Sequence, residues 1–266
     1  MEYWFSEHHT EDVKFSVRVD KHLYSNENDL GRVDIFDSIE YGRILAVDGY
    51  IIFTERDEFI YDEMLAHVPM AVHKDARKIL VFGAGDGGVI DELVKYESIE
   101  RIDLVEINDG VVEACRKFFP DVAASLDDPR VNLYTDNALR FIRHIENEYD
   151  IIIVDSAGFY GPGESLLTRE FYGSCYKALK EDGIMVNQQG SPFYQEDGSY
   201  DFVREIDGDS VSDILAYVEY DPHRVLNGIR KSAERAVREN RITPAQRYKL
   251  MQAFEDGLRG YTYFER

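Results

Sequence analysis

RKILVFGAGDGGV, residues 77–89, is the stretch that decides the fold. An apolar run of strand type breaks into glycines there, and a helical pattern follows from Val89. About twenty residues later, the run Leu104-Val105-Glu106 ends on an acid. This order is typical of a nucleoside-binding α/β unit, in which the acid accepts hydrogen bonds from the ribose hydroxyls. Asp86 lies inside the glycine loop, where a phosphate-binding loop avoids negative charge, so the pattern favours a cationic nucleoside over a dinucleotide.

After residue 77 the chain alternates short apolar runs with helical patterns. We predict strands over 78–82, 101–106, 131–135, 149–155 and 183–188, and helices over 89–96, 109–119, 138–146 and 168–179. Such alternation indicates right-handed βαβ units and a parallel sheet that binds ligands at the carboxyl ends of its strands. The fold class is therefore α/β.

The two flanking regions have different patterns. Apolar runs at 13–23, 32–38, 43–47 and 50–54 predict a small antiparallel β region, which must pack on the next domain or on another subunit. A helical pattern starts at Glu55, and Pro69 is expected to end or kink that helix. The C-terminal part favours a strand over 200–206 and helices over 211–218, 221–240 and 243–257. We divide the chain into a β domain (1–54), a Rossmann-like nucleoside-binding domain (55–198) and a mostly helical tail (199–266).

Composition excludes several classes of partner. The 52 acids against 30 Lys and Arg give a net charge of −22, which argues against nucleic acid and anionic membranes and suits cationic substrates. The acidity is equally consistent with a role in solubility alone. Cys115 and Cys175 are the two cysteines, so no disulfide framework and no thiol metal cluster is expected. No signal peptide pattern opens the sequence, and we expect a cytoplasmic protein.

Four acids follow successive predicted strands, so the topology would bring Asp86, Glu106, Asp136 and Asp155 to one rim of the sheet. Glu106 suits the ribose, Asp136 with its neighbour Asn137 suits the adenine amino group, and Asp86 suits a cationic group of the ligand. Asp155 follows a wholly apolar run, where burial and neighbouring acids would raise its pKa, so we predict that it is a general base. The alternative is that each acid only caps a helix or shapes a turn.

A series of longer motifs occurs in a fixed order along the chain. They are Val47-Asp48-Gly49, residues 54–59, Tyr61, residues 63–69, the loop 83–89, Val105-Glu106-Ile107, residues 115–120, residues 128–131, Val154-Asp155-Ser156, Gly161-Pro162 and Ser191-Pro192-Phe193. In this order and spacing they resemble the spermidine synthase (polyamine aminopropyltransferase) family, over residues 1 to about 196.

The resemblance implies a β-rich N-terminal domain and a methyltransferase-like sheet that binds decarboxylated S-adenosylmethionine as co-substrate, with no cofactor and no metal. A diamine such as putrescine would attack the methylene carbon next to the sulfonium, giving spermidine and 5′-methylthioadenosine. Asp155 would be the general base, Tyr61 its catalytic neighbour, and both would contact the acceptor amine together with Gln188. The resemblance also implies a homodimer or homotetramer. Donor contacts are implied for Gly83, Gly85, Asp86, Glu106, Asp136, Asn137 and Asp62.

Some positions depart from the family pattern. Leu30-Gly31 stands where the family has Tyr-Gln, Asp62 where it has His or Gln, and Asn108 where it has Asp. Gly158 replaces a second loop acid that helps to hold the acceptor amine. Loss of one carboxylate from a site for a dication weakens binding by about one to three kcal/mol.

The largest departure is the C-terminal part. Residues 207–265, with Ala216-Tyr217-Val218 and Gly260-Tyr261-Thr262-Tyr263, resemble the extreme C-terminus of biosynthetic arginine decarboxylases. This part carries no cofactor lysine and no catalytic cysteine of a pyridoxal enzyme, so no decarboxylase activity is expected. The competing prediction is a catalytically impaired nucleoside-binding protein whose tail mediates protein interaction. A methyltransferase is disfavoured by Asp86, because a methyl donor that bears a carboxylate would be repelled there.

Overall fold

The computed structural model describes residues 2–9, 11–155, 166 and 168–188. The chain divides into two compact units, Met1–Phe202 and Val203–Arg266, and all described residues belong to the first. The predicted strand 200–206, the predicted tail helices and Gly158 lie outside the described residues. Across the ranges that are described, no helix combines the length and the apolar character that a membrane crossing requires.

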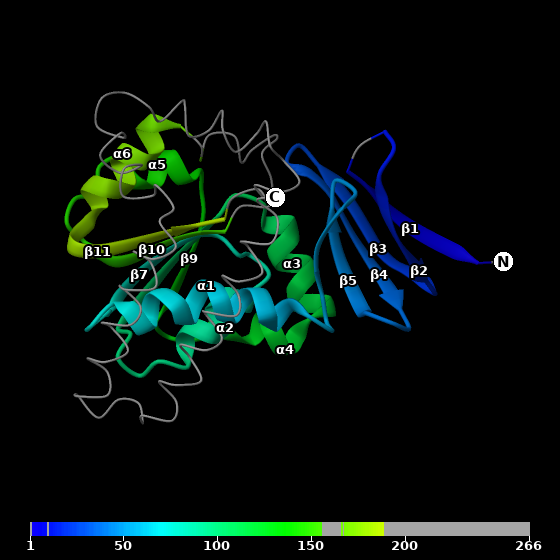
Figure 1. The fold of residues 1–266 in the computed structure, drawn as a ribbon, viewed down its shortest axis with the longest axis horizontal. Coiled ribbons are helices and arrows are strands. Elements are labelled where there is room, and N and C mark those ends of the chain that lie inside the picture. The colour runs from blue at the N-terminus through cyan, green and yellow to red at the C-terminus, as the bar shows by residue number, and fades with distance from the viewer. Residues whose placement is uncertain (1, 10, 156–165, 167, 189–266) are drawn as a thin grey trace, which may run out of the picture. The chain divides into compact units, whose positions relative to one another are not determined.

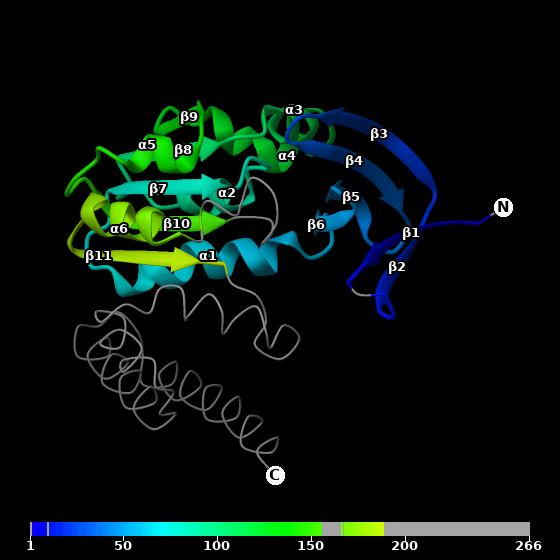
Figure 2. The ribbon, with the colours of Figure 1, turned by 90° about the horizontal axis from the view of Figure 1, so that it is seen from above.

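Five parallel strands form the centre of the first unit, in the order β11-β10-β7-β8-β9 (Figure 2). Their bounds are β7 (Lys78–Gly83), β8 (Arg101–Glu106), β9 (Val131–Thr135), β10 (Tyr149–Asp155) and β11 (Leu179–Asn187). The order reverses between β7 and β10, and such a switch point opens a ligand crevice at the carboxyl ends of the strands. The predicted α/β class and parallel sheet are confirmed.

Helices cover both faces of this sheet (Figure 1). Ile79 and Val81 of β7 pack in one core with Leu65 and Leu93, whereas the alternate residues of β7 pack with α5 and α6 in a second core. Because successive side chains of a strand point to opposite faces, the strands of a sheet covered on both sides are apolar throughout. The helices are α1 (Glu58–Val72), α2 (Gly88–Val94), α3 (Asp109–Phe118), α4 (Pro120–Ala123), the 3₁₀ helix η1 (Ala124–Asp127), α5 (Ala138–Ile142) and α6 (Arg169–Ala178).

The N-terminal residues form two antiparallel sheets. One has the order β3-β4-β5-β6 and the other pairs β1 with β2. Val33 and Ile35 of β4 join the core that contains α1, whereas Phe36 and Ile44 face the β1–β2 pair. The β region therefore packs on the following domain, as predicted. The strands are β1 (Tyr3–His8), β2 (Lys14–Val19), β3 (Lys21–Asn28), β4 (Gly31–Ser38), β5 (Gly42–Val47) and β6 (Tyr50–Thr54).

In the first seventy residues the prediction of one strand was wrong, and of the two alternatives for Pro69, an end or a kink of the helix, the end is contradicted. The single strand expected over 13–23 is divided at Asp20, because β2 pairs with β1 whereas β3 pairs with β4 in the other sheet. Pro69 does not end α1, which continues to Val72. Proline removes one donor from a helix, and the packing of Leu65, Ala66 and Met70 in the core maintains the helix beyond it.

After residue 77, the predicted helices and strands are present, but some of them begin or end at other residues than predicted. Strand β11 begins at Leu179 rather than 183, because Lys180 pairs with buried Asp150 across a distance of 2.7 Å and extends the contact with β10. Helix α5 ends at Ile142 instead of 146, and α4 and η1 had no sequence signal that we recognised. In the described sheet β11 is an edge strand.

Gly83 ends β7 in a conformation that favours glycine. Its φ is +79°, and a Cβ atom there would lie 1.6 Å from the backbone oxygen of Asp155. Gly49 also has a positive φ, of +85°, but no atom lies within 4 Å of the corresponding position. Gly83 therefore permits a close approach between β7 and β10, whereas Gly49 only turns the chain.

We expect Gly83→Ala to lower the free energy of unfolding by more than about 3 kcal/mol, because two backbones must separate. Gly49→Ala, the matched control, should lose only about 1–2 kcal/mol, the strain of a positive φ. Urea denaturation followed by far-ultraviolet circular dichroism measures both. Equal losses in the two variants would contradict the close-approach interpretation.

Candidate active site

Tyr61 and Asp155 meet at the carboxyl end of the sheet. The Tyr61 hydroxyl, from the first turns of α1, donates a 2.6 Å hydrogen bond to Oδ1 of Asp155 at the end of β10. Tyr61 is 39% exposed, so one side of the pair is open to solvent and ligands. The two residues predicted to be catalytic are thus brought into direct contact although 94 positions separate them.

The glycine loop places Asp86 beside this pair. Gly83 and Gly87 have positive φ angles, and the Asp86 carboxylate accepts a 2.8 Å hydrogen bond from the backbone N–H of Gly88. The carboxylate is thereby held at the start of α2. Its pKa is raised by burial, although the hydrogen bond from Gly88 opposes that shift.

Asp62 lies on α1 beneath the loop and is 7% exposed. Its Oδ2 atom would be 2.1 Å from a Cβ atom at Gly88, so the carboxyl group occupies the space that any larger residue would need there. Burial and the charges of Asp86 and Asp155 raise the pKa of Asp62 to about 9. Asp62 is therefore neutral at pH 7 in the protein without ligand.

Glu106 closes the other side of the glycine loop. One carboxylate oxygen accepts from the backbone N–H of Gly85 at 3.2 Å, and the other accepts from the N–H of Asn108 at 2.7 Å. A Cβ atom at Gly85 would lie 2.6 Å from the Glu106 side chain, so this glycine is also required by close contact. Each oxygen retains a second lone pair, which is the geometry that two ribose hydroxyls would use.

Asp136 and Asn137 follow β9 on the same rim, and Glu106 pairs with Thr135 in the parallel ladder. Asp136 accepts hydrogen bonds from the Asn137 backbone N–H and from Nε of Arg140, both at 2.6 Å. The Asn137 side chain caps α5 by accepting from the backbone N–H of Arg140 at 3.1 Å. The turn-forming and capping alternative thus describes the contacts of both residues, and an adenine contact stays a prediction.

Gln188 lies next to the catalytic pair. It follows Asn187, which pairs with Val154 in the ladder, and its backbone N–H donates to the Val154 carbonyl at 3.0 Å. Its side-chain Oε1 is buried, and among the described residues it has no hydrogen-bond partner. A buried amide oxygen without a donor is suited to accept a hydrogen bond from a ligand N–H group.

The buried acids of this rim have raised pKa values. Burial and the charges of Asp86 and Glu106 raise the pKa of Asp155 to about 7, and the hydrogen bond from Tyr61 opposes that shift. The pKa of the Tyr61 hydroxyl is raised as well, by burial and by the Asp155 charge, so Tyr61 stays a donor. A positive ligand would restore the ionised form of each acid.

Two polar residues at this rim, Asn28 and Asn108, form a contact that the sequence did not predict. Asn108 caps α3 by accepting from the backbone N–H of Gly110 at 3.1 Å, and its Oδ1 also accepts from Nδ2 of Asn28 at 3.2 Å. Asn28 ends β3, so the N-terminal sheet reaches the ribose side of the rim. The 80 positions between Asn28 and Asn108 left no local signal for this contact.

A five-stranded parallel sheet with a glycine loop, an acid placed for ribose and a cluster of acids at the switch point defines a nucleoside-binding enzyme of the Rossmann type. The family described as spermine/spermidine synthase domain matches residues 58–219, and the spermidine synthase tetramerisation domain matches residues 3–55. The chain belongs to the spermine/spermidine synthase family. An arginine decarboxylase C-terminal helical extension matches residues 211–264, so both resemblances found in the sequence are confirmed.

Relatives with a described activity share about half of the aligned residues. The polyamine aminopropyltransferase of Clostridium perfringens (strain 13 / Type A) is 55% identical over 196 residues, which are 74% of this chain and 69% of that protein. The polyamine aminopropyltransferase of Agathobacter rectalis is 55% identical over 197 residues, with the same shares of the two chains. The predicted class of enzyme, polyamine aminopropyltransferase, is thereby confirmed.

Solved structures agree with the fold. A spermidine synthase in complex with the transition-state analogue AdoDATO has a TM-score of 0.74 and 39% sequence identity, over 77% of this chain and 70% of that one. The spermidine synthase from Thermotoga maritima has a TM-score of 0.72 and 39% identity, over 77% and 69%. The roles of the individual site residues and the domain boundaries stay predictions.

The raised pKa of Asp62 predicts a pH-dependent stability. A folded pKa of about 9, against an ordinary value of 3.8, favours the folded state at low pH, and this contribution is lost as the pH rises through 9. Asp62→Asn should therefore melt at least about 2 °C above the unsubstituted protein at pH 9, with a smaller difference at pH 5. Differential scanning fluorimetry across this range is the measurement. Asp121→Asn, at an exposed acid of α4, is the control, and the same shift in both variants would refute the prediction.

Proposed function

We propose that this protein transfers the aminopropyl group of decarboxylated S-adenosylmethionine to putrescine or a related diamine, forming spermidine and 5′-methylthioadenosine. The observation that carries the proposal is the Tyr61–Asp155 pair, which lies beside the acidic glycine loop at the switch point of the sheet. Both substrates carry positive charge, and Asp62, Asp86 and Asp155 form an acidic environment that favours cations.

Asp155 acts as the general base. An acceptor ammonium gives one proton to the Asp155 carboxylate, and the freed nitrogen lone pair attacks the methylene carbon next to the sulfonium. The carbon–sulfur bond breaks with its electron pair remaining on sulfur, so the sulfonium becomes a neutral thioether and the new secondary amine carries the positive charge. A pKa of about 7 supports this role, because a base works best when its pKa is near the operating pH.

The donor occupies the side of the rim formed by the glycine loop. Gly83 and Gly85 let the nucleoside approach the backbone, Glu106 accepts from the ribose hydroxyls, and Asp136 with Asn137 faces the adenine. Asp86 and Asp62 hold the aminopropyl ammonium, which ionises Asp62 by lowering its pKa from about 9. Binding of the adenine requires Asp136 to exchange its contact with the exposed Arg140 for the ligand.

The acceptor occupies the side of the rim near β11. Tyr61 and Asp155 hold the reacting nitrogen. Oε1 of Gln188, which has no partner within the part of the chain that the structure describes, accepts from an N–H group of the diamine. A carboxylate elsewhere would be needed to hold the distal ammonium tightly, and Gly158 stands where the family has that acid. We therefore expect weak binding of the acceptor.

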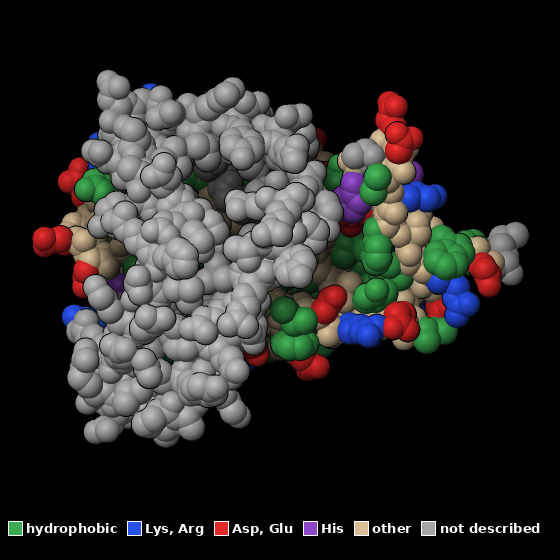
Figure 3. Space-filling model, viewed as in Figure 1, with side chains coloured by type: hydrophobic (Ala, Val, Ile, Leu, Met, Phe, Trp, Pro, Cys, Tyr) green, Lys and Arg blue, Asp and Glu red, His purple; other side chains and the backbone are tan. Residues whose placement is uncertain are grey.

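An oligomer is supported by the match to a tetramerisation domain, and we propose a homodimer or homotetramer. Hydrophobic side chains gather over the N-terminal strands (Figure 3). Separately, Tyr3 and Trp4 of β1 are 60% and 57% exposed, and Phe15 of β2 is exposed as well. Large apolar side chains exposed on one small sheet are a feature that protein interfaces use. The predicted cytoplasmic location stays a prediction.

A second candidate is a nucleoside-binding protein without turnover, whose tail mediates an interaction with another protein. The match of residues 211–264 to an arginine decarboxylase extension favours it, because the polyamine aminopropyltransferase of Clostridium perfringens aligns with only 74% of this chain. Incubation with decarboxylated S-adenosylmethionine and putrescine, cadaverine or agmatine separates the two candidates. Release of methylthioadenosine supports the transferase, and methylthioadenosine binding without turnover supports the second candidate.

Asp155→Asn should lower kcat by about 10²- to 10⁴-fold, because the variant cannot accept the ammonium proton. In the unsubstituted enzyme log kcat/KM should rise with pH up to about 7 and then level off, since the ionised form of Asp155 is the active one. A methylthioadenosine assay from pH 5 to pH 9 measures both. Turnover by Asp155→Asn at the unsubstituted rate would refute the general-base role.

Tyr61→Phe tests the hydrogen bond separately. The bond from the Tyr61 hydroxyl lowers the pKa of Asp155, so its removal should move the rising limb of the pH–rate profile to higher pH. Tyr50→Phe, at an exposed tyrosine of β6, is the control and should leave the profile unchanged. A Tyr61→Phe profile that moves to lower pH would show that the sign of this interaction is wrong.

A further inference from the structure

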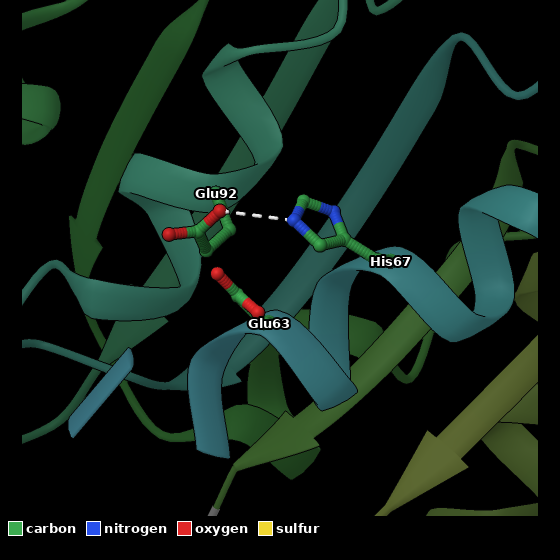
Figure 4. Close-up of side chains that lie close together, drawn as sticks. All are labelled: Glu63, His67 and Glu92. Carbon is green, nitrogen blue, oxygen red and sulfur yellow. Dashed lines mark ion pairs between the residues drawn. The ribbon is translucent and has the colours of Figure 1, made fainter. Parts of the chain in front are cut away.

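Outside the acidic rim, a polar cluster joins helices α1 and α2. Glu63 and His67 come from α1 and Glu92 from α2, and one ligand atom of each lies within 4.8 Å of the others (Figure 4). His67 Nε2 is 3.0 Å from Oε2 of Glu92, which is 6% exposed. One histidine and two carboxylates could hold a divalent metal, so the neighbours of the cluster decide its role.

Neighbouring side chains already form hydrogen bonds with His67 and Glu92. Lys95 Nζ lies 2.5 Å from the other Glu92 oxygen, and the Tyr96 hydroxyl lies 2.8 Å from Nδ1 of His67. In neutral imidazole the Nε2–H group donates to Glu92 while Nδ1 accepts from the Tyr96 hydroxyl. A metal would have to displace Lys95 and break the His67–Glu92 contact, so the geometry favours a link between the helices. We call His67, Glu92, Lys95 and Tyr96 the α1–α2 clamp.

The clamp sets the position of α1, which carries Tyr61 and Asp62, relative to α2, which begins directly after the glycine loop. Asp62 is already in close contact with Gly88, so a small shift of α1 changes the distance between Tyr61 and Asp155. His67 lies six positions after Tyr61, fewer than two helical turns, and a short stretch of helix is stiff.

Without the clamp the two helices would repel each other. Burial raises the pKa values of Asp62 and Glu58 on α1, and the charge of Glu92 on α2 adds to both shifts, so acids from the two helices face one another. His67 and Lys95 donate the hydrogen bonds that the Glu92 carboxylate accepts at this contact. Removal of His67 would leave a buried carboxylate facing α1 without its partner from that helix.

We propose that His67, through its hydrogen bond to Glu92, positions Tyr61 on Asp155 for the transfer step. His67 is a positioning residue, since it touches neither substrate. The predicted effect of His67 on kcat rests on the proposed function. The predicted effect of His67 on the position of Tyr61 rests on the geometry of the α1–α2 clamp alone.

His67→Ala should lower kcat about tenfold, because misplacement of a catalytic group by a fraction of an ångström is sufficient for that loss. Affinity for methylthioadenosine should change less than about twofold, since Glu106 on β8 holds the ribose independently of α1. His67→Gln keeps a donor for Glu92 and should recover most of kcat. Val68→Ala, at the exposed neighbouring position on α1, is the control.

The double variant decides whether His67 acts through Tyr61. In a Tyr61→Phe background, His67→Ala should lower kcat by less than about twofold, because the group that it positions is already absent. Multiplicative losses would overturn the proposal, as would a fall in methylthioadenosine affinity that parallels kcat. Loss of turnover on treatment of the unsubstituted enzyme with EDTA, with recovery on addition of Zn²⁺, would overturn it in favour of a metal site.

A measurement without turnover separates this inference from the proposed function. The titration of Asp155, followed by carboxyl ¹³C NMR, should move to higher pH in His67→Ala, as it should in Tyr61→Phe, and should return in His67→Gln. An unchanged titration in His67→Ala would refute the clamp even in a fully active enzyme. Absence of transfer by the unsubstituted protein would refute the proposed function, while the titration would still test the clamp.

Discussion

The close approach of two backbones at the ends of β7 and β10 is the constraint on which the rest of the site depends. Asp155 pairs with Gly83 in the parallel ladder, and its carbonyl oxygen occupies the space where a side chain of residue 83 would begin. This contact brings the glycine loop and the predicted base together at the point where the strand order reverses. The other contacts of the rim are built around these two strand ends.

The four acids buried close together at the rim affect both the stability of the protein and the chemistry of the site. Asp62, Asp86, Asp155 and Glu106 all have raised pKa values, because burial opposes ionisation of each, and the charge of Asp86 raises the pKa values of the other three further. The same arrangement favours a ligand that brings positive charges, since each cation restores the ionised form of a neighbouring acid. An acceptor that must lose a proton then meets a base whose pKa already lies near neutrality.

Prediction from the sequence succeeded where adjacent residues alone specify the local structure. The apolar runs of β7 and β10 could be identified because both of their faces are buried. The glycines at 83 and 85 could be identified because the Asp155 backbone approaches the first closely and the Glu106 side chain approaches the second. It failed where distant residues decide the outcome. The early start of β11 depends on the Lys180–Asp150 pair, and the His67–Glu92 contact joins two helices, so neither leaves a signal in adjacent residues.

The sequence by itself determined the α/β class, the order of strands and helices, and the presence of acids after successive strands, because backbone preference and burial follow from short-range patterns. Only the tertiary structure decided which of those acids meet. It placed Asp155 against Tyr61 and Asp62 beneath Gly88, while it left Asp136 paired with Arg140 and Asn137 capping α5. The physical reason is that side-chain partnership depends on how helices pack on the sheet, and that packing is set by contacts between residues far apart in the chain.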